Sequence, residues 1–323
     1  MLTYILFFVG FVFLVKGASF LVDGASSLAK RWGFSDIIIG LTIVAIGTSA
    51  PELIINIIAN IRGSGDLSFS NIIGSDILNI LFVLGIAALI YPLIIRKETV
   101  WKEIPFCLLA PAILFYLAND RWFNRSTSSI LSRVDGLIMI ALFIFFIIYA
   151  VFIARSRKHP KIEHKKHPPA LAIPMIILGV LGLFFGGEWV IQGGIAISRA
   201  LGMSESAIGL TIISLGTTLP ELTTAIVAAL KKKNDIVIGT IIGSNVFNIL
   251  FILGFSALIK PIAFNPILNT DIILYGLFTL LFFLFLLMSR QFLKDKHYSL
   301  GRWAGAAFIT VYLLYVFSVM IRN

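Results

Sequence analysis

Charged residues, cysteine and histidine are all scarce in this chain of 323 residues. Charged residues make up 13% of it, whereas soluble domains average about 25%. This scarcity excludes a soluble domain of useful size between the apolar segments. The single cysteine, Cys107, excludes an intrachain disulfide and a cysteine metal cluster. The histidines fall in expected loops, which excludes a buried Ser–His pair of the kind an intramembrane hydrolase needs: His159, His164, His167 and His297.

Long apolar runs are what the chain has in abundance. Hydrophobic residues make up 59% of it, and the mean hydropathy is +0.99. A membrane-spanning helix needs about 20 apolar residues, and continuous runs rather than alternating strands exclude a β-barrel. The pattern predicts an all-α polytopic membrane protein in a lipid bilayer, with a first helix retained rather than cleaved. Ten spans are expected, at 2–26, 36–61, 68–92, 103–118, 134–154, 170–197, 205–230, 236–259, 269–289 and 303–320.

The net charge of +10 is explained by where the basic residues lie. Most Lys and Arg residues fall in the loops on one side of the expected spans, and the largest group is in residues 155–166. Basic loops remain in the cytoplasm. We therefore expect a protein of the cell membrane with both termini on the extracytoplasmic side, and we expect no nucleic-acid partner.

Two segments of the chain recur at a constant offset of 169 residues. GLTIVAIGTSAPEL at 40–53 returns as GLTIISLGTTLPEL at 209–222, and IIGSDILNILFVLG at 72–85 returns as IIGSNVFNILFILG at 241–254. We expect a first repeat at 1–154, a basic cytoplasmic linker at 155–168 and a second repeat at 169–323. Five spans per repeat would give the two repeats opposite orientations, as in inverted-repeat transporters.

Each repeat places one glutamate, Glu52 or Glu221, well inside an apolar span. A charged carboxylate at that depth costs about 3 kcal/mol on insertion scales and needs a compensating partner. A bound cation would serve both glutamates. Two alternatives are a salt bridge to Lys16, the only basic residue within a span, and protonated, hydrogen-bonded glutamates.

A proline precedes each glutamate, and hydroxyl residues precede each proline. Because proline lacks an N–H and clashes with the preceding turn, we expect the helix to loosen and to leave carbonyls without partners near 45–47 and near 214–216. Hydroxyl oxygens follow at Thr48, Ser49, Thr217 and Thr218. Carboxylate, hydroxyl and carbonyl oxygens suit Ca²⁺ and Na⁺, whereas the lack of thiols argues against Zn²⁺ or Cu⁺.

The second motif, GSxxxN, puts a serine and an asparagine on one helix face, four residues apart. Its members are Ser75 with Asn79, and Ser244 with Asn248. They are candidate ligands, or they form interhelical hydrogen bonds. Gly74 and Gly243 would let the helix approach its neighbour closely. Asp76, which Asn245 replaces in the second repeat, lies about 60° around the helix from Asn79. Three roles are open to it: a third carboxylate of the site, a protonated side chain, or a partner of Lys16.

Together these motifs resemble the two α-repeats of the sodium/calcium exchangers, in the cation/calcium antiporter superfamily. The chain resembles a compact prokaryotic member, since its central linker is short. The resemblance implies that Glu52 and Glu221 are the main calcium ligands and that spans 1 and 6 slide across a core of spans 2, 3, 7 and 8. It also implies hydroxyl, carbonyl and amide ligands at Thr48, Ser49, Ser75, Thr217, Thr218, Ser244, Ala45, Ser214, Asn79 and Asn248.

We therefore expect a secondary antiporter that exchanges Na⁺ for Ca²⁺ by alternating access, with no organic cofactor and no enzymatic activity. Asn248 stands where potassium-dependent members of the family carry aspartate, which argues against potassium co-transport. The main alternative is an antiporter coupled to protons or to another divalent cation. A channel is less consistent with two opposed broken helices, and an intramembrane protease would need a catalytic pair that the chain lacks.

Overall fold

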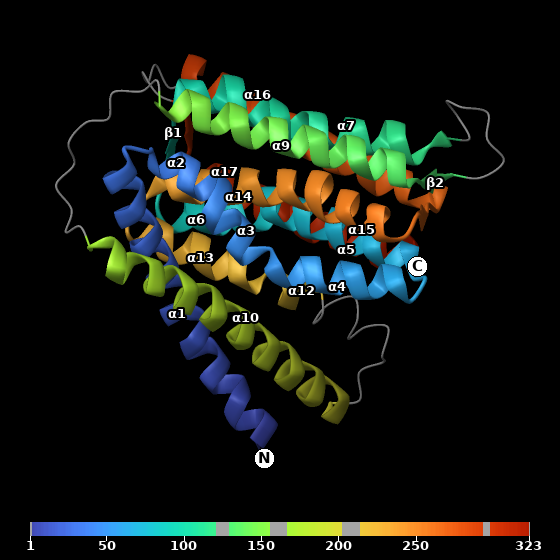
Figure 1. Cartoon of the computed structure of the whole chain (residues 1–323), viewed down its shortest axis with the longest axis horizontal. Helices are drawn as coiled ribbons and strands as arrows, with labels where there is room; N and C mark the ends of the chain where they lie inside the picture. The colour runs from blue at the N-terminus through green and yellow to red at the C-terminus, as the bar shows by residue number, and fades with distance from the viewer. Residues whose placement is uncertain (1, 121–128, 156–166, 202–213, 293–297, 323) are drawn as a thin grey trace.

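The computed structural model describes residues 2–120, 129–155, 167–201, 214–292 and 298–322 (Figure 1). Long helices dominate, as the apolar runs predict. The first half contains α1 (Leu2–Trp32), α2 (Asp36–Ile39), η1 (Gly40–Val44), α3 (Ala45–Thr48), α4 (Ala50–Ile61), α5 (Gly65–Leu78), η2 (Asn79–Val83), α6 (Leu84–Ile90), β1 (Leu93–Ile95), η3 (Thr99–Glu103), α7 (Ile104–Ala118), β2 (Ile130–Leu131) and α9 (Arg133–Arg155).

The second half follows a similar order in its described elements. It contains α10 (Pro169–Ala200), α12 (Ser214–Thr217), α13 (Leu219–Leu230), α14 (Asn234–Val246), η5 (Phe247–Leu253), α15 (Gly254–Ile259), β3 (Ile262–Ala263), η6 (Pro266–Leu268), α16 (Asn269–Phe292), β4 (Tyr298–Leu300) and α17 (Arg302–Arg322). Residues 156–166, most of the expected linker, lie outside the described residues.

Eight of the described helices are long and apolar enough to cross a membrane, and a bent pair, 36–48 with 50–61, could form a ninth span. The span expected at 205–230 is described only from Ser214 onward, as α12 and α13. Strands were not expected. In the described residues β1 pairs with β4, and β2 pairs with β3, as two short antiparallel ribbons at helix ends. Pairing satisfies backbone groups that these connections would otherwise leave open.

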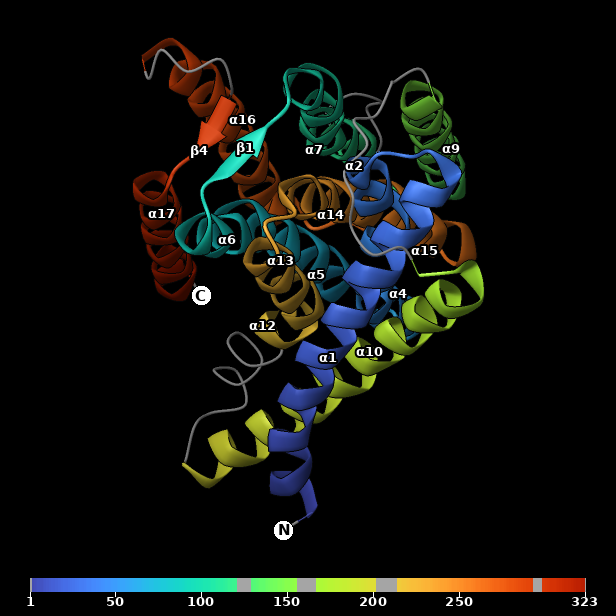
Figure 2. The ribbon, with the colours of Figure 1, turned by 90° about the vertical axis from the view of Figure 1, so that its left-hand side faces the viewer.

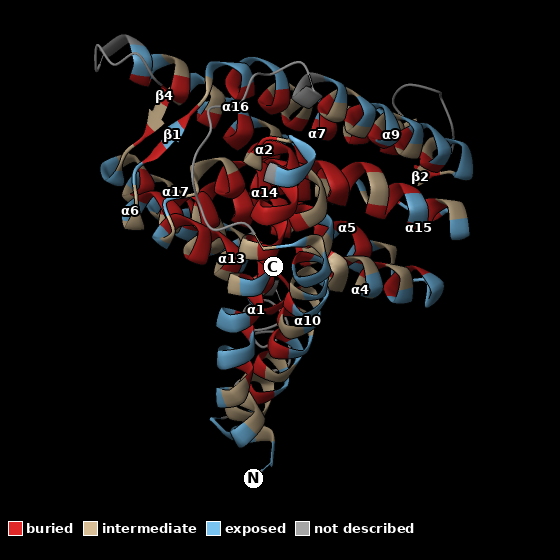
Figure 3. Cartoon of the chain, turned by 60° about the vertical axis from the view of Figure 1, so that its left-hand side comes forward, coloured by how far each residue is buried: buried red, intermediate tan, exposed pale blue. Residues whose placement is uncertain are grey.

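The centre of the molecule is formed by two continuous helical runs, α5–η2–α6 and α14–η5–α15. In their most apolar stretches 78% and 94% of the residues are buried, against 6% in α17. A helix that is apolar on all sides is covered either by other elements or by lipid, and these two runs are covered by other elements. The buried residues in Figure 3 accordingly concentrate around α14.

Helices α1 and α10 form a separate pair along one side of this core (Figures 1 and 2). Their contact is made through glycines. A Cβ atom added to Gly10 would lie 2.8 Å from the carbonyl oxygen of Gly186, and one added to Gly179 would lie 2.9 Å from that of Gly17. Small residues let two membrane helices approach to backbone contact, and this pair uses them along its length.

Several contacts recur when 169 is added to one residue number and subtracted from the other. The Gly10–Gly186 contact maps onto Gly179–Gly17 in this way. The Leu93–Leu300 strand pair maps onto Ile262–Leu131. The approach of α6 to α17 at Gly85 and Gly305 likewise maps onto that of α15 to α9 at Gly254 and Gly136. Each half therefore offers the other the same contact surfaces.

Candidate cation site

The helix carrying the first glutamate breaks at one residue. Ser49, with φ −83° and ψ 13°, separates α3 from α4, and the helical segments 36–48 and 50–61 are bent by 48°. Thr218, with φ −90° and ψ 2°, separates α12 from α13 in the same manner. Pro51 and Pro220 lie in the first turns of α4 and α13, where a missing N–H costs no hydrogen bond. Each proline is thus the second residue of the helix that follows the break.

The expected free carbonyl at Ala45 is not found. Its oxygen accepts hydrogen bonds from the Ser49 N–H at 3.0 Å and from Thr48 Oγ1 at 3.2 Å. For Ala45 the expectation of a free carbonyl was wrong, because the backbone before the break remains helical and the threonine folds back on it. Ser214 is the first residue of α12, and its side chain lies outside the described residues.

Glu52 and Glu221 lie in the first turns of α4 and α13 and are buried. The positive end of a helix dipole stabilises a carboxylate at such a position. Glu221 Oε1 accepts a hydrogen bond from Ser49 Oγ at 2.8 Å and a longer one from Ser244 Oγ at 3.5 Å. Both oxygens of Glu52 and the Oε2 atom of Glu221 have no hydrogen-bond partner among the described residues.

Lys16 does not compensate Glu52 in this structure. It is exposed on α1, and no described donor reaches either Glu52 oxygen. The salt-bridge alternative is therefore wrong for Glu52. Glu221 and Asp76 are close enough to interact electrostatically with Glu52, so acidic groups gather where a cation would be stabilised.

Hydroxyl groups connect the broken helices to the central runs. Thr48 Oγ1 lies 3.4 Å from Ser244 Oγ on α14, and Thr218 Oγ1 donates to Ser75 Oγ on α5 at 3.3 Å. Thr217 is buried next to the break in the second half. The structure thus brings together hydroxyl residues from both halves that the sequence placed more than a hundred residues apart.

The central runs contain π-helical segments at the two site asparagines. Asn79 is the first residue of η2, and Asn248 is the second residue of η5. Such segments are frequent at functional sites. Asn79 Nδ2 donates to Asn245 Oδ1 at 2.9 Å, and Asn248 Nδ2 donates to Asp76 Oδ1 at 2.9 Å. Asn245 was not among the expected ligands, and its equivalence to Asp76 at the offset of 169 is the signal in the sequence that could have indicated it.

Six buried acceptor oxygens from these residues lack a hydrogen-bond donor within the described ranges: Glu52 Oε1 and Oε2, Glu221 Oε2, Asp76 Oδ2, Asn79 Oδ1 and Asn248 Oδ1. Buried polar atoms normally have partners, and oxygens of this kind are ligands for hard cations. No group of three His, Cys, Asp or Glu side chains suited to a metal ion occurs in the described part of the chain. The candidate ligands for a cation are therefore the carboxylates of two glutamates together with neutral oxygens, and Asp76 lies beside them.

The two glycines of the GSxxxN motif differ in their surroundings. A Cβ atom on Gly243 would lie 2.6 Å from the carbonyl oxygen of Leu41, which confirms the expected close approach. No described atom lies within 4 Å of the equivalent position on Gly74. The residues that would match Leu41 and Ala45 in the second half are 210 and 214, and residue 210 lies outside the described ranges.

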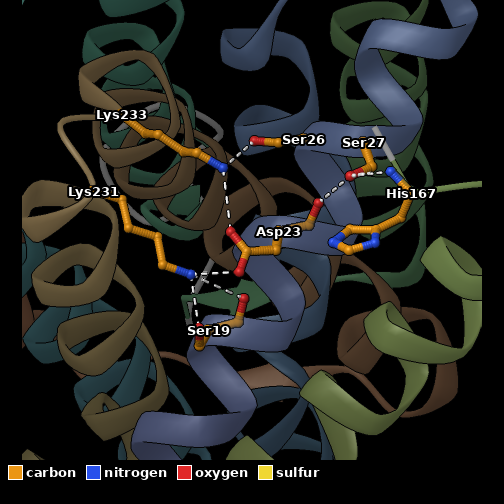
Figure 4. A network of polar contacts seen from close by, with 7 residues as sticks. All are labelled: Ser19, Asp23, Ser26, Ser27, His167, Lys231 and Lys233. Atoms are coloured by element: carbon orange, nitrogen blue, oxygen red, sulfur yellow. Dashed lines mark hydrogen bonds and ion pairs between the residues drawn. The ribbon is translucent and has the colours of Figure 1, made fainter. Parts of the chain in front are cut away.

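A second polar cluster attaches α1 to the turn between α13 and α14 (Figure 4). Lys231 Nζ lies 2.6 Å from Asp23 Oδ2 and donates to Ser19 Oγ at 2.7 Å. Lys233 Nζ lies 3.5 Å from Asp23 Oδ1 and donates to Ser26 Oγ at 2.9 Å. Burial lowers the pKa of Lys233 from its usual value, and the Asp23 carboxylate partly opposes this shift. Lys231 is the closer partner of Asp23.

Comparison with known proteins identifies the family. The family model described as sodium/calcium exchanger protein matches residues 2–152 and again residues 171–321. The chain is 35% identical over 261 residues to a putative antiporter, CaxA, of Alkalimonas amylolytica, covering 78% of this chain and 79% of the relative. It is 28% identical to the sodium/calcium exchanger MaX1 of Methanosarcina acetivorans, covering 97% of each.

The fold is also that of a solved exchanger. The structure of the sodium-calcium exchanger NCX_Mj soaked with Na⁺ and Sr²⁺ matches with a TM-score of 0.82 and 30% identity, covering 98% of this chain and 97% of that one. The family model matches both halves with bounds that differ by the same 169 residues as the motifs. The chain belongs to the sodium/calcium exchanger protein family and is a polytopic membrane protein.

Proposed function

We propose that the protein exchanges Na⁺ for Ca²⁺ across the cell membrane as a secondary antiporter that works by alternating access. The observation that carries the proposal is the set of buried, donorless oxygens around Glu52 and Glu221. An uncompensated carboxylate inside a membrane is costly, and a cation offsets that cost for both glutamates at once. Membership in a family of exchangers, rather than of enzymes, supports this assignment.

The proposed ligands come from both halves of the chain. Glu52 and Glu221 supply the charge for Ca²⁺, and hydroxyl and amide oxygens complete the Ca²⁺ and Na⁺ sites: Thr48, Ser49, Thr217, Thr218, Ser75, Ser244, Asn79 and Asn248. The carbonyls of Ala45 and Ser214 are included, and that of Ala45 would have to turn from its present hydrogen bonds to reach an ion. Organic cofactors have no part in the scheme.

The proposed topology has ten spans, arranged as two inverted five-helix repeats at 1–154 and 169–323 and joined by a cytoplasmic linker at 155–168. The contacts that recur at the 169-residue offset support a two-fold relation between the repeats. The basic loops support placing both termini outside the cytoplasm.

Antiport follows from the charge of the site. Two glutamates in a low dielectric cannot stabilise Ca²⁺ together with several Na⁺, so the site holds one kind of ion at a time. Only loaded states then change access, and Na⁺ moving down its gradient drives Ca²⁺ the other way. The α1–α10 pair is the proposed moving part, because its glycine contact joins it into one unit outside the core.

The test is ⁴⁵Ca²⁺ uptake into proteoliposomes loaded with Na⁺, with and without an outward Na⁺ gradient. Uptake should need the gradient and fall to background in Glu52→Gln and in Glu221→Gln, because each variant removes a charge that offsets Ca²⁺. Lys16→Gln is the matched control, since that side chain is exposed on α1, and it should transport normally.

The alternative, a proton-coupled antiporter, predicts a different result in the same assay. It would take up Ca²⁺ under a pH gradient without Na⁺. Such uptake, unchanged by sodium, would contradict the proposed coupling while leaving the site intact. Ca²⁺ flux that is unaffected in both glutamine variants would contradict the site.

A further inference from the structure

The two site asparagines are each held by a residue of the opposite repeat. Asn248 donates to Asp76, and Asn79 donates to Asn245. These two bonds map onto one another at the offset of 169, since 79 corresponds to 248 and 76 to 245. Asp76 and Asn245 are both fully buried. The equivalent position in each repeat therefore contacts the site asparagine of the other.

These contacts fix which end of each amide faces the site. The Oδ1 atom of Asp76 accepts, so Asn248 must present its Nδ2 group to it and turn its own Oδ1 away. Asn245 Nδ2 donates at 3.1 Å to the backbone oxygen of Asp76, an atom that can only accept. Asn245 therefore offers Oδ1 to Asn79, which must donate Nδ2 in return. For Asn245 and Asn79 the assignment of oxygen and nitrogen follows from a backbone oxygen, and for Asn248 it follows from the Asp76 carboxylate.

The orientation of the two amides leaves both of their oxygen atoms without a hydrogen-bond donor. Asn79 Oδ1 and Asn248 Oδ1 are buried and have no donor within the described ranges. An amide free to rotate would present either an oxygen or a positively polarised NH₂ group to a cation. With the nitrogen of each amide engaged, only the oxygen remains available.

We propose that Asp76 is a positioning residue that orients Asn248 so that its amide oxygen faces the transported cation, and that Asn245 does the same for Asn79. This inference rests on the proposed function and adds to it residues outside the ligand set. Asp76 acts through Asn248 and does not itself bind the ion. An asparagine at position 76 could accept the same bond through its own Oδ1, as Asn245 does in the second repeat.

The test compares Asp76→Leu with Asp76→Asn, using Ca²⁺ binding to the purified protein measured by calorimetry and the K0.5 and maximal rate of ⁴⁵Ca²⁺ uptake. Asp76→Leu cannot accept a hydrogen bond and should weaken Ca²⁺ binding about tenfold, the effect of losing one bond to a charged group. Asp76→Asn should stay within about twofold of wild type, because the acceptor is restored. The change should appear in K0.5 rather than in the maximal rate.

A double-mutant cycle separates positioning from any other role. In an Asn248→Ala background the amide is gone, so adding Asp76→Leu should change Ca²⁺ binding no further. Additive losses would overturn the proposal, as would an Asp76→Asn variant that binds as weakly as Asp76→Leu, which would show that the charge itself acts on the ion. Size-exclusion profiles and thermal unfolding exclude a folding defect, and Asp76→Asn tests the proposal even if Asp76→Leu fails to fold.

The wild-type protein distinguishes this inference from the proposed function. Wild type that binds Ca²⁺ but shows no sodium-driven uptake would overturn the antiport assignment, and the cycle would still decide the role of Asp76. Wild type that binds no Ca²⁺ would overturn both.

Discussion

At the scale of single residues, a hydroxyl at the helix break controls the conformation of a glutamate in the other repeat. Ser49 Oγ donates to Glu221 Oε1 at 2.8 Å and leaves Oε2 without a described partner. Ser49→Ala removes this donor and frees the carboxylate to rotate. A hydrogen bond to a charged group contributes about 1.5–3 kcal/mol, so we expect the Ca²⁺ concentration for half-maximal uptake to rise about tenfold or more.

The matched control for this substitution is Ser49→Thr, because Thr218 occupies the equivalent position in the second repeat. It keeps the hydroxyl and should transport with nearly unchanged Ca²⁺ dependence. Concentration-dependent ⁴⁵Ca²⁺ uptake measures both variants. An alanine variant with the same half-maximal concentration as wild type would show that this bond does not organise the site.

At the scale of elements, the pairing of α1 with α10 depends on glycines at the contact. A Cβ atom on Gly179 would lie 2.6 Å from the backbone nitrogen of Leu21, whereas one on Gly187 would lie 3.8 Å from the Pro220 ring. Gly179→Ala should force the helices apart and lower stability by about 1–3 kcal/mol, as overpacking generally does. Gly187→Ala adds the same methyl group to the same helix, where there is room for it.

Thermal unfolding in detergent measures the difference between these two variants. Gly179→Ala should unfold at a lower temperature than wild type, and Gly187→Ala at the same or a slightly higher one, because alanine favours a helix over glycine. Equal effects of the two alanines would indicate that the α1–α10 contact is looser than the structure has it.

At the scale of the whole molecule, the polar cluster in Figure 4 ties α1 to the turn between α13 and α14. The residues equivalent to Asp23, Ser19 and Lys231 are Gln192, Glu188 and Arg62. Glu188 is exposed and accepts from Gln192 at 2.7 Å, and Arg62 is also exposed. If the repeats exchange conformations during transport, Arg62 approaches Glu188 in the opposite state, as Lys231 approaches Asp23 in this one.

Substitutions at these two acids should therefore shift the conformational balance in opposite directions. Asp23→Asn disfavours the present conformation, and Glu188→Gln disfavours the opposite one. A partly exposed ion pair contributes about 0.2–1 kcal/mol, which changes the population ratio by about 1.4- to fivefold. Distances between spin labels on α1 and on the α13–α14 turn measure the populations, and shifts in the same direction for both variants would contradict the alternation.

Much of this protein follows from its sequence alone. The apolar runs determined a helical membrane protein, because lipid offers backbone groups no partner outside a helix or a closed barrel. The duplicated motifs indicated Glu52 and Glu221, because a carboxylate within an apolar run demands compensation wherever the chain folds. Local patterns of this kind carry their physical reason within a few residues.

The tertiary structure decided what depends on a second segment of chain. It showed that Ala45 has its carbonyl occupied, that Lys16 is exposed, and that Asp76 and Asn245 accept hydrogen bonds from the asparagines of the opposite repeat. It also revealed the ion pairs of Asp23 with the α13–α14 turn. These contacts join residues far apart in the chain, and a hydrogen bond depends on positions and directions that only the packing of the helices fixes.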